Sequence, residues 1–99
     1  LRIRMGDPMA GLSSADRAIA IIEKRRVDSP AIQKLGAVLA GALRVRADGL
    51  VALERWDEAQ RTLTRAITIL QTPELEERYA DMIADLEAQL DRAKRRVAE

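Results

Sequence analysis

Apolar residues recur along the chain at the three- and four-residue spacing of amphipathic helices. Short polar breaks divide the pattern into four segments, which predict helices at about residues 14–26, 30–54, 57–70 and 73–97. Because each break is only two or three residues long, consecutive helices are expected to pack as antiparallel hairpins. The pattern therefore predicts an all-α fold of four helices, arranged either as an array of helical hairpins or as a four-helix bundle.

The clearest of these segments runs from Leu53 to Pro73. Its apolar residues are spaced to share one face of a helix, and they are Ala59, Leu63, Ala66, Ile67 and Leu70. Asp57, with Gln60 three residues later, has the pattern of a capping box, which predicts that the helix begins there. Thr72 and Pro73 are predicted to end this helix and begin the next, because threonine is a good cap and proline suits the first helical position.

The N-terminal residues have a different composition. Gly6, Pro8 and Gly11 fall within six positions, and this density of helix breakers predicts that residues 1–12 form a flexible arm. Residues 13–99 are expected to form a single helical domain, because a chain of 99 residues supplies one modest core.

Two further features of the pattern point to contacts beyond a simple core. Gly36 and Gly41 lie inside the second predicted helix, where each glycine costs about 1 kcal/mol relative to alanine, so another backbone or a ligand is expected to approach there. The last predicted helix carries an apolar seam at alternating four- and three-residue spacing, formed by Tyr79, Ile83, Leu86 and Leu90. This seam either packs inside the same domain or forms a dimer interface between two copies of the chain.

Composition narrows the chemistry that these helices can support. Histidine and cysteine are both absent, which removes the commonest general base and the usual ligands of zinc. Acidic residues do follow one another along the last predicted helix, but interleaved arginines indicate an ordinary solvated surface; these acids are Asp81, Asp85, Glu87 and Asp91. We therefore expect no catalysis, no metal site and no cofactor.

The charge balance bears on partners. The chain has 17 basic and 16 acidic residues, for a formal net charge of +1, so nothing pulls it as a whole toward nucleic acid or an anionic membrane. Basic residues at Lys24–Arg26 and Arg92–Arg96 leave a nucleic-acid-binding helical domain as a less favoured alternative, since aromatic residues for base stacking are lacking. No apolar run reaches the roughly 18 residues of a membrane span. With no signal segment visible either, the default expectation is a cytoplasmic protein.

The junction of the second and third predicted helices carries a distinctive spacing. A small residue is followed by an aromatic at the turn and then by two alanines flanking a large residue, at Ala47, Trp56, Ala59, Leu63 and Ala66. In this spacing the chain from Gly41 to Pro73 resembles a tetratricopeptide repeat, a family of helical hairpins. Glu54 stands where that family has its turn glycine, Pro73 comes two positions late, and no second copy follows at the family's period of about 34 residues.

The resemblance implies a protein–protein interaction module that binds a peptide or a partner helix in a groove between helices. Its groove positions fall on Arg44, Asp48 and Val51, beside the small residues near Gly41. Members that bind carboxylates place a lysine or arginine one turn from an asparagine. Arg44 fits the first position, but Asp48 replaces the second, and the two are expected to pair with each other. The alternative function is a self-associating structural subunit that uses the seam of the last helix as its dimer interface.

Overall fold

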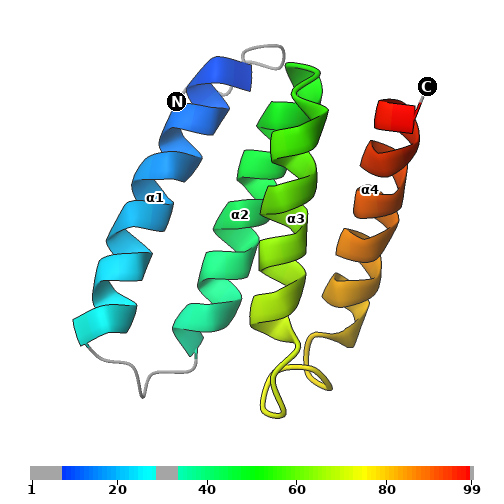
Figure 1. Ribbon diagram of the computed structural model, residues 1–99. Coiled ribbons are helices and arrows are strands. Elements are labelled where there is room, and N and C mark those ends of the chain that lie inside the picture. Colours follow the sequence, from blue (N-terminus) through cyan, green and yellow to red (C-terminus); the bar gives the residue numbers. More distant parts are fainter. Residues whose placement is uncertain (1–7, 29–33, 99) are drawn as a thin grey trace.

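The computed structural model describes residues 8–28 and 34–98. This part of the chain forms four helices, namely α1 (Pro8–Asp28), α2 (Lys34–Ala52), α3 (Trp56–Leu70) and α4 (Ala80–Ala98), and contains no strand. Consecutive helices run antiparallel and pack against each other (Figure 1). The predicted all-α fold of four helices is therefore confirmed.

Helix α1 begins at Pro8, about six residues earlier than predicted. Residues 8–12 of the predicted arm are helical, whereas residues 1–7 lie outside the described residues. A proline is tolerated in the first turn, since the N–H groups there have no partner within the helix. Leu12 is buried in a small cluster with Leu50 and Ala59, and this tertiary contact favours the earlier start. The predicted beginning of the second helix, residues 30–33, also lies outside the described residues.

Helix α4 begins at Ala80 rather than at Pro73, and residues 73–79 form a series of turns. The carbonyl oxygen of Thr72 accepts hydrogen bonds from the N–H groups of Leu75 and Glu76, at 3.1 and 2.8 Å. The Leu75 side chain is buried in the core. The helix start predicted at Pro73 is thus wrong, because burial of Leu75 outweighs the local preference for a helix.

The packing of Leu75 also explains one of the two helix glycines. A Cβ atom built on Gly36 would lie 3.1 Å from Cδ1 of Leu75, so the absence of a side chain on α2 makes room for this leucine. The close approach at Gly36 is thus made by a side chain of the same chain, and not by a backbone or a ligand as predicted. A Cβ atom on Gly41 would meet no atom within 4 Å among the described residues.

The main core is aliphatic and receives side chains from all four helices. Its larger members are Ile19, Ile22, Leu39, Leu43, Leu63, Ile67, Leu70, Leu75, Ile83 and Leu86. Tyr79 and Leu90 are half-buried and pack against this cluster. The apolar seam of α4 thus faces the core of its own chain, and a dimer through it would require α4 to leave that core.

The connection between α2 and α3 is a tight helix-ending turn. The N–H of Arg55 donates to the carbonyl of Leu50 at 2.8 Å, and the N–H of Glu54 donates to that of Val51 at 2.9 Å. These two bonds are those of a Schellman motif, in which the next-to-last residue adopts a left-handed conformation. That residue is Glu54, with φ of 59°, the same position at which the tetratricopeptide resemblance expects glycine.

Helix α3 begins one residue earlier than predicted and is not capped as predicted. Arg55 precedes the first helical residue and makes no side-chain capping hydrogen bond, while Asp57 lies within the first turn. The capping box of Asp57 and Gln60 is therefore wrong. Instead of a capping box, the start of α3 has a hydrogen bond from Nε of Arg55 to Oε1 of Glu58 at 2.8 Å. The two acids of the first turn, Asp57 and Glu58, lie at the positive end of the helix dipole.

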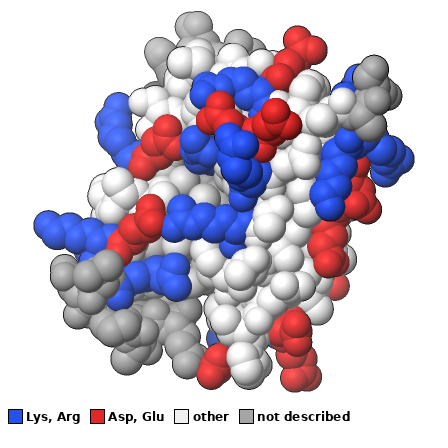
Figure 2. Space-filling view, in the orientation of Figure 1, with Lys and Arg blue, Asp and Glu red and all other residues white. Residues whose placement is uncertain are grey.

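Arg46 joins three helices on the side of α2 that faces α1 and α3. Its Nε donates to Asp16 of α1 at 2.8 Å, and its Nη1 donates to Oγ1 of Thr62 of α3 at 2.7 Å. The Thr62 hydroxyl in turn donates to the carbonyl of Glu58 at 2.9 Å, whose carboxylate lies 3.7 Å from Arg46. A second ion pair, between Arg65 and Glu23, joins α3 to α1. Acidic and basic side chains intermingle over the face of the molecule shown in Figure 2.

Candidate functional site: a cleft between α2 and α4

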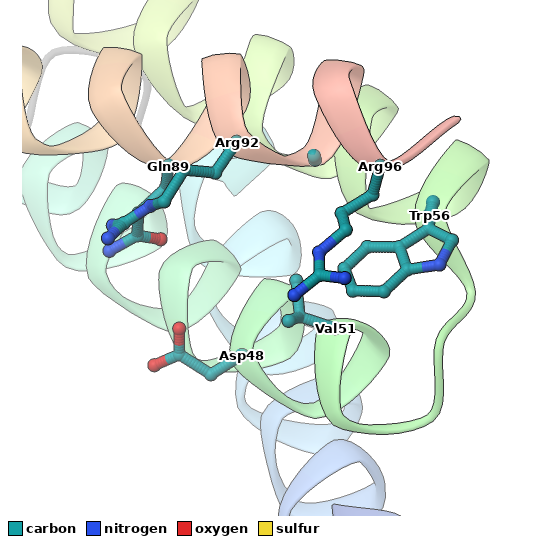
Figure 3. A pocket seen from close by; sticks show the side chains of 7 residues that line it. Asp48, Val51, Trp56, Gln89, Arg92 and Arg96 are labelled. Carbon is teal, nitrogen blue, oxygen red and sulfur yellow. The ribbon is translucent and has the colours of Figure 1, made fainter. Parts of the chain in front are cut away.

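A cleft of about 370 Å³ opens between the C-terminal halves of α2 and α4, next to the start of α3. Figure 3 shows the side chains that line it, which are Asp48, Val51, Trp56, Gln89, Arg92, Ala93 and Arg96. Its volume falls at the lower end of the range of ligand-binding clefts. A cleft of this size accommodates one or two side chains of a larger partner.

The fold brings these residues together through two regularities. Because neighbouring helices alternate in direction, α2 and α4 run parallel and end on the same side of the molecule (Figure 1). Gln89, Arg92 and Arg96 are three and four residues apart, so they share one side of α4. Asp48 and Val51, three residues apart on α2, face them.

The floor of the cleft is apolar. Trp56 is half-buried, Ala93 is buried, and the Val51 side chain remains 37% exposed within the cleft. The guanidinium carbon of Arg96 lies 5.8 Å from the centre of the Trp56 ring, within the range of a cation–π interaction. Figure 3 shows this stacking, with Val51 beside the guanidinium. Val51 and Trp56 therefore offer apolar surface to an occupant.

The rim of the cleft is polar and carries both charges. In Figure 3 Gln89 and Arg92 extend side by side from α4, and Asp48 faces them from α2. Burial raises the pKa of the Asp48 carboxyl above its ordinary value, and the Arg44 guanidinium partly opposes this shift. Within residues 8–28 and 34–98, neither Asp48 nor Arg92 forms a hydrogen bond or an ion pair. Both groups are thus available to an occupant.

The residues predicted to bind a partner are divided by the structure. Asp48 and Val51 line the cleft. Arg44 lies outside the lining, and its Nη2 donates to Oδ2 of Asp85 on α4 at 2.7 Å. The ion pair predicted between Arg44 and Asp48 is therefore replaced by a bridge from α2 to α4. Gly41 also lies outside the lining and is half-buried.

Sequence reasoning did not assign the α4 side of the cleft or the place of Trp56 in its lining. The spacing of Gln89, Arg92 and Arg96 was readable as one side of a helix. That spacing does not indicate which helix lies opposite. The sequence interpretation concerned the apolar seam, which lies on another side of α4. Trp56 was recognised for its place at the turn, and the packing of α4 against that turn makes it part of the cleft.

Residues 8–28 and 34–98 contain no group of three or more side chains that could together hold a metal ion. None of the four helices is long and apolar enough to cross a membrane. Comparison of the chain with protein-family models, curated proteins and solved structures found no match. The tetratricopeptide resemblance therefore stays a prediction.

Proposed function

We propose that this chain is a protein–protein interaction module that binds a peptide or a partner helix in the cleft between α2 and α4. The observation that carries the proposal is the composition of the cleft. Val51 and Trp56 provide an apolar floor, and Asp48, Gln89 and Arg92 provide hydrogen-bonding groups at the rim. A few placed polar groups around apolar surface are typical of recognition sites, in which the apolar part supplies affinity and the polar part fixes orientation.

The tetratricopeptide resemblance supports the same proposal. Two of the three groove positions that it implies, Asp48 and Val51, line the cleft. Glu54 adopts positive φ at the position where the family has glycine. Both observations are what a hairpin of this family would present, and such hairpins bind extended peptides or helices on their inner surface.

The proposal is tested by selecting short random peptides displayed on phage against the folded chain. Affinities of the selected peptides are then measured by isothermal titration calorimetry. Val51→Glu places a charge on the apolar floor and is expected to weaken binding about tenfold or more. The matched control is Ile21→Glu, because Ile21 is 61% exposed on α1 and does not line the cleft.

Circular dichroism first establishes that both variants remain folded. Equal affinities for Val51→Glu and Ile21→Glu would place the binding surface elsewhere. Failure to select any peptide would count against the proposed function as a whole.

A further inference from the structure

Arg92 differs from four arginines that lie on α2, on α3 or in the turn between them. Each of these four pairs with a carboxylate of the same chain, as Arg44–Asp85, Arg46–Asp16, Arg55–Glu58 and Arg65–Glu23. Arg92 forms no such pair with any residue that the structure describes. Its guanidinium lies at the rim of the cleft, next to the amide of Gln89 (Figure 3). The cleft thus presents a hydrogen-bond donor of fixed positive charge that is not paired with a carboxylate of residues 8–28 or 34–98.

The charges around the cleft favour an anionic occupant. Its lining contains two guanidinium groups, of Arg92 and Arg96, and one carboxylate, of Asp48. A cationic group placed on Asp48 would meet Arg44 one turn away on α2 and Arg92 across the cleft. A carboxylate that binds the Arg92 guanidinium could also accept a hydrogen bond from the side-chain amide of Gln89. Hydrogen bonds that involve a charged group are among the stronger polar contacts.

We propose, on the basis of the function proposed above, that the partner is an acidic peptide segment. One of its carboxylates binds Arg92, and an adjacent aliphatic or aromatic side chain covers Val51 and Trp56. Asp48 faces the same guanidinium and competes with the partner for it. This aspartate therefore limits affinity and selects for segments that carry a strong negative charge.

The inference is tested with the phage-selected peptides and three variants. Selected sequences are expected to be enriched in Asp or Glu beside a large apolar residue. Arg92→Glu should weaken their binding at least about tenfold, the typical worth of a hydrogen bond between charged groups. Lys94→Glu carries the same change of charge on the same helix outside the cleft, and should weaken binding less than about threefold.

Asp48→Asn provides the opposite change. Removal of the competing carboxylate should tighten binding about two- to fivefold, the range of a partly exposed charge pair. Affinity for the unsubstituted chain should also fall as salt concentration rises, because added ions screen the contact with Arg92. A selection repeated on Arg92→Glu should then enrich Lys or Arg in place of Asp or Glu.

The outcomes separate this inference from the function on which it rests. One outcome would overturn the inference and leave the proposed interaction module intact. In that outcome Val51→Glu weakens binding, but the selected peptides are not enriched in Asp or Glu and bind Arg92→Glu and Lys94→Glu equally well. Peptides insensitive to Val51→Glu would overturn both. Light scattering could instead detect a dimer that Val51→Glu dissociates. The occupant of the cleft would then be a second copy of the chain, and the proposal of an acidic peptide partner would be overturned.

Discussion

The two sides of α2 use the same kinds of side chain in different ways. On the side facing α1 and α3, Arg46 is bonded to Asp16 and Thr62 and lies close to Glu58. On the side facing α4, Arg44 pairs with Asp85, but further along the helix Arg92 and Asp48 face each other across the cleft without forming a bond to each other. The first arrangement holds three helices in place, since its polar groups satisfy one another. The pair of Arg92 and Asp48 leaves polar groups available, and this is the place at which we propose that a partner binds.

The largest effect is expected where α4 is held in place, because α4 forms one wall of the cleft. Leu90→Lys puts an ammonium group on the half-buried seam that packs against the main core, and should lower the free energy of unfolding by about 2–4 kcal/mol or unfold the chain. Chemical denaturation followed by circular dichroism measures this change. Ala88→Lys, on the exposed side of the same helix, is the control. A folded Leu90→Lys monomer from a dimeric parent would show instead that the seam is intermolecular.

The next effect compares the two arginines directly. Arg46→Ala leaves Asp16 and Thr62 without their partner and should destabilise the fold by about 1–3 kcal/mol. Arg92→Ala should change the free energy of unfolding by no more than about 0.5 kcal/mol, since Arg92 makes no bond with the described residues. Urea denaturation of the two variants gives both values. Equal destabilisation would remove the distinction between a structural side and a binding side of α2.

A smaller gain in stability is expected at the turn that lies in the chain between Arg46 and Trp56. Glu54 has positive φ, a conformation that costs a residue with a side chain about 1 kcal/mol and costs glycine little. Glu54→Gly should therefore raise the thermal midpoint, by an amount equivalent to about 0.5–1 kcal/mol. Glu54→Ala keeps the strain and should not give this gain. Similar midpoints for the two variants would mean that the Glu54 conformation is not strained.

The smallest effect concerns Asp48 and depends on pH. Because burial raises the pKa of its carboxyl in the folded state, despite the opposing Arg44, the folded chain holds this proton more tightly than the unfolded chain does. The ionised group therefore disfavours folding above the folded-state pKa, and this penalty disappears as pH falls below the ordinary value of 3.8. Asp48→Asn should be slightly more stable than the parent at pH 7 but not at pH 3, as measured by denaturation at both values. A constant difference at the two pH values would assign it to another cause.

The sequence predicted the fold well where the helix pattern is local. Helix α3 has its buried residues on a single face, and its end at Leu70 matches the prediction. The starts of α1 and α4 were missed because they depend on tertiary contacts. Leu12 packs on α2 and α3, and Leu75 packs beside Gly36. Patterns of glycine, proline and capping residues describe only local preferences, and these contacts outweigh them.

The candidate site was predictable in part for the same reason. Asp48 and Val51 were predicted from the tetratricopeptide resemblance, whose residues lie on α2 and α3, adjacent helices of the chain. Arg92 becomes part of the site only because α2 and α4 run parallel on the same side of α3, and that arrangement joins residues 44 positions apart. Arg44 was expected to bond Asp48 on its own helix, but the bridge to Asp85 uses the same packing of α4.

The position of Trp56 makes the cleft observable without a label. Trp56 is the only tryptophan in the chain, so all indole emission comes from the floor of this cleft. An apolar side chain that settles on the ring removes water from it and shifts the emission to shorter wavelength. Displacement of the stacked Arg96 would change the intensity as well. Every variant described above can therefore be titrated through the fluorescence of the protein itself, and the signal arises at the surface in question.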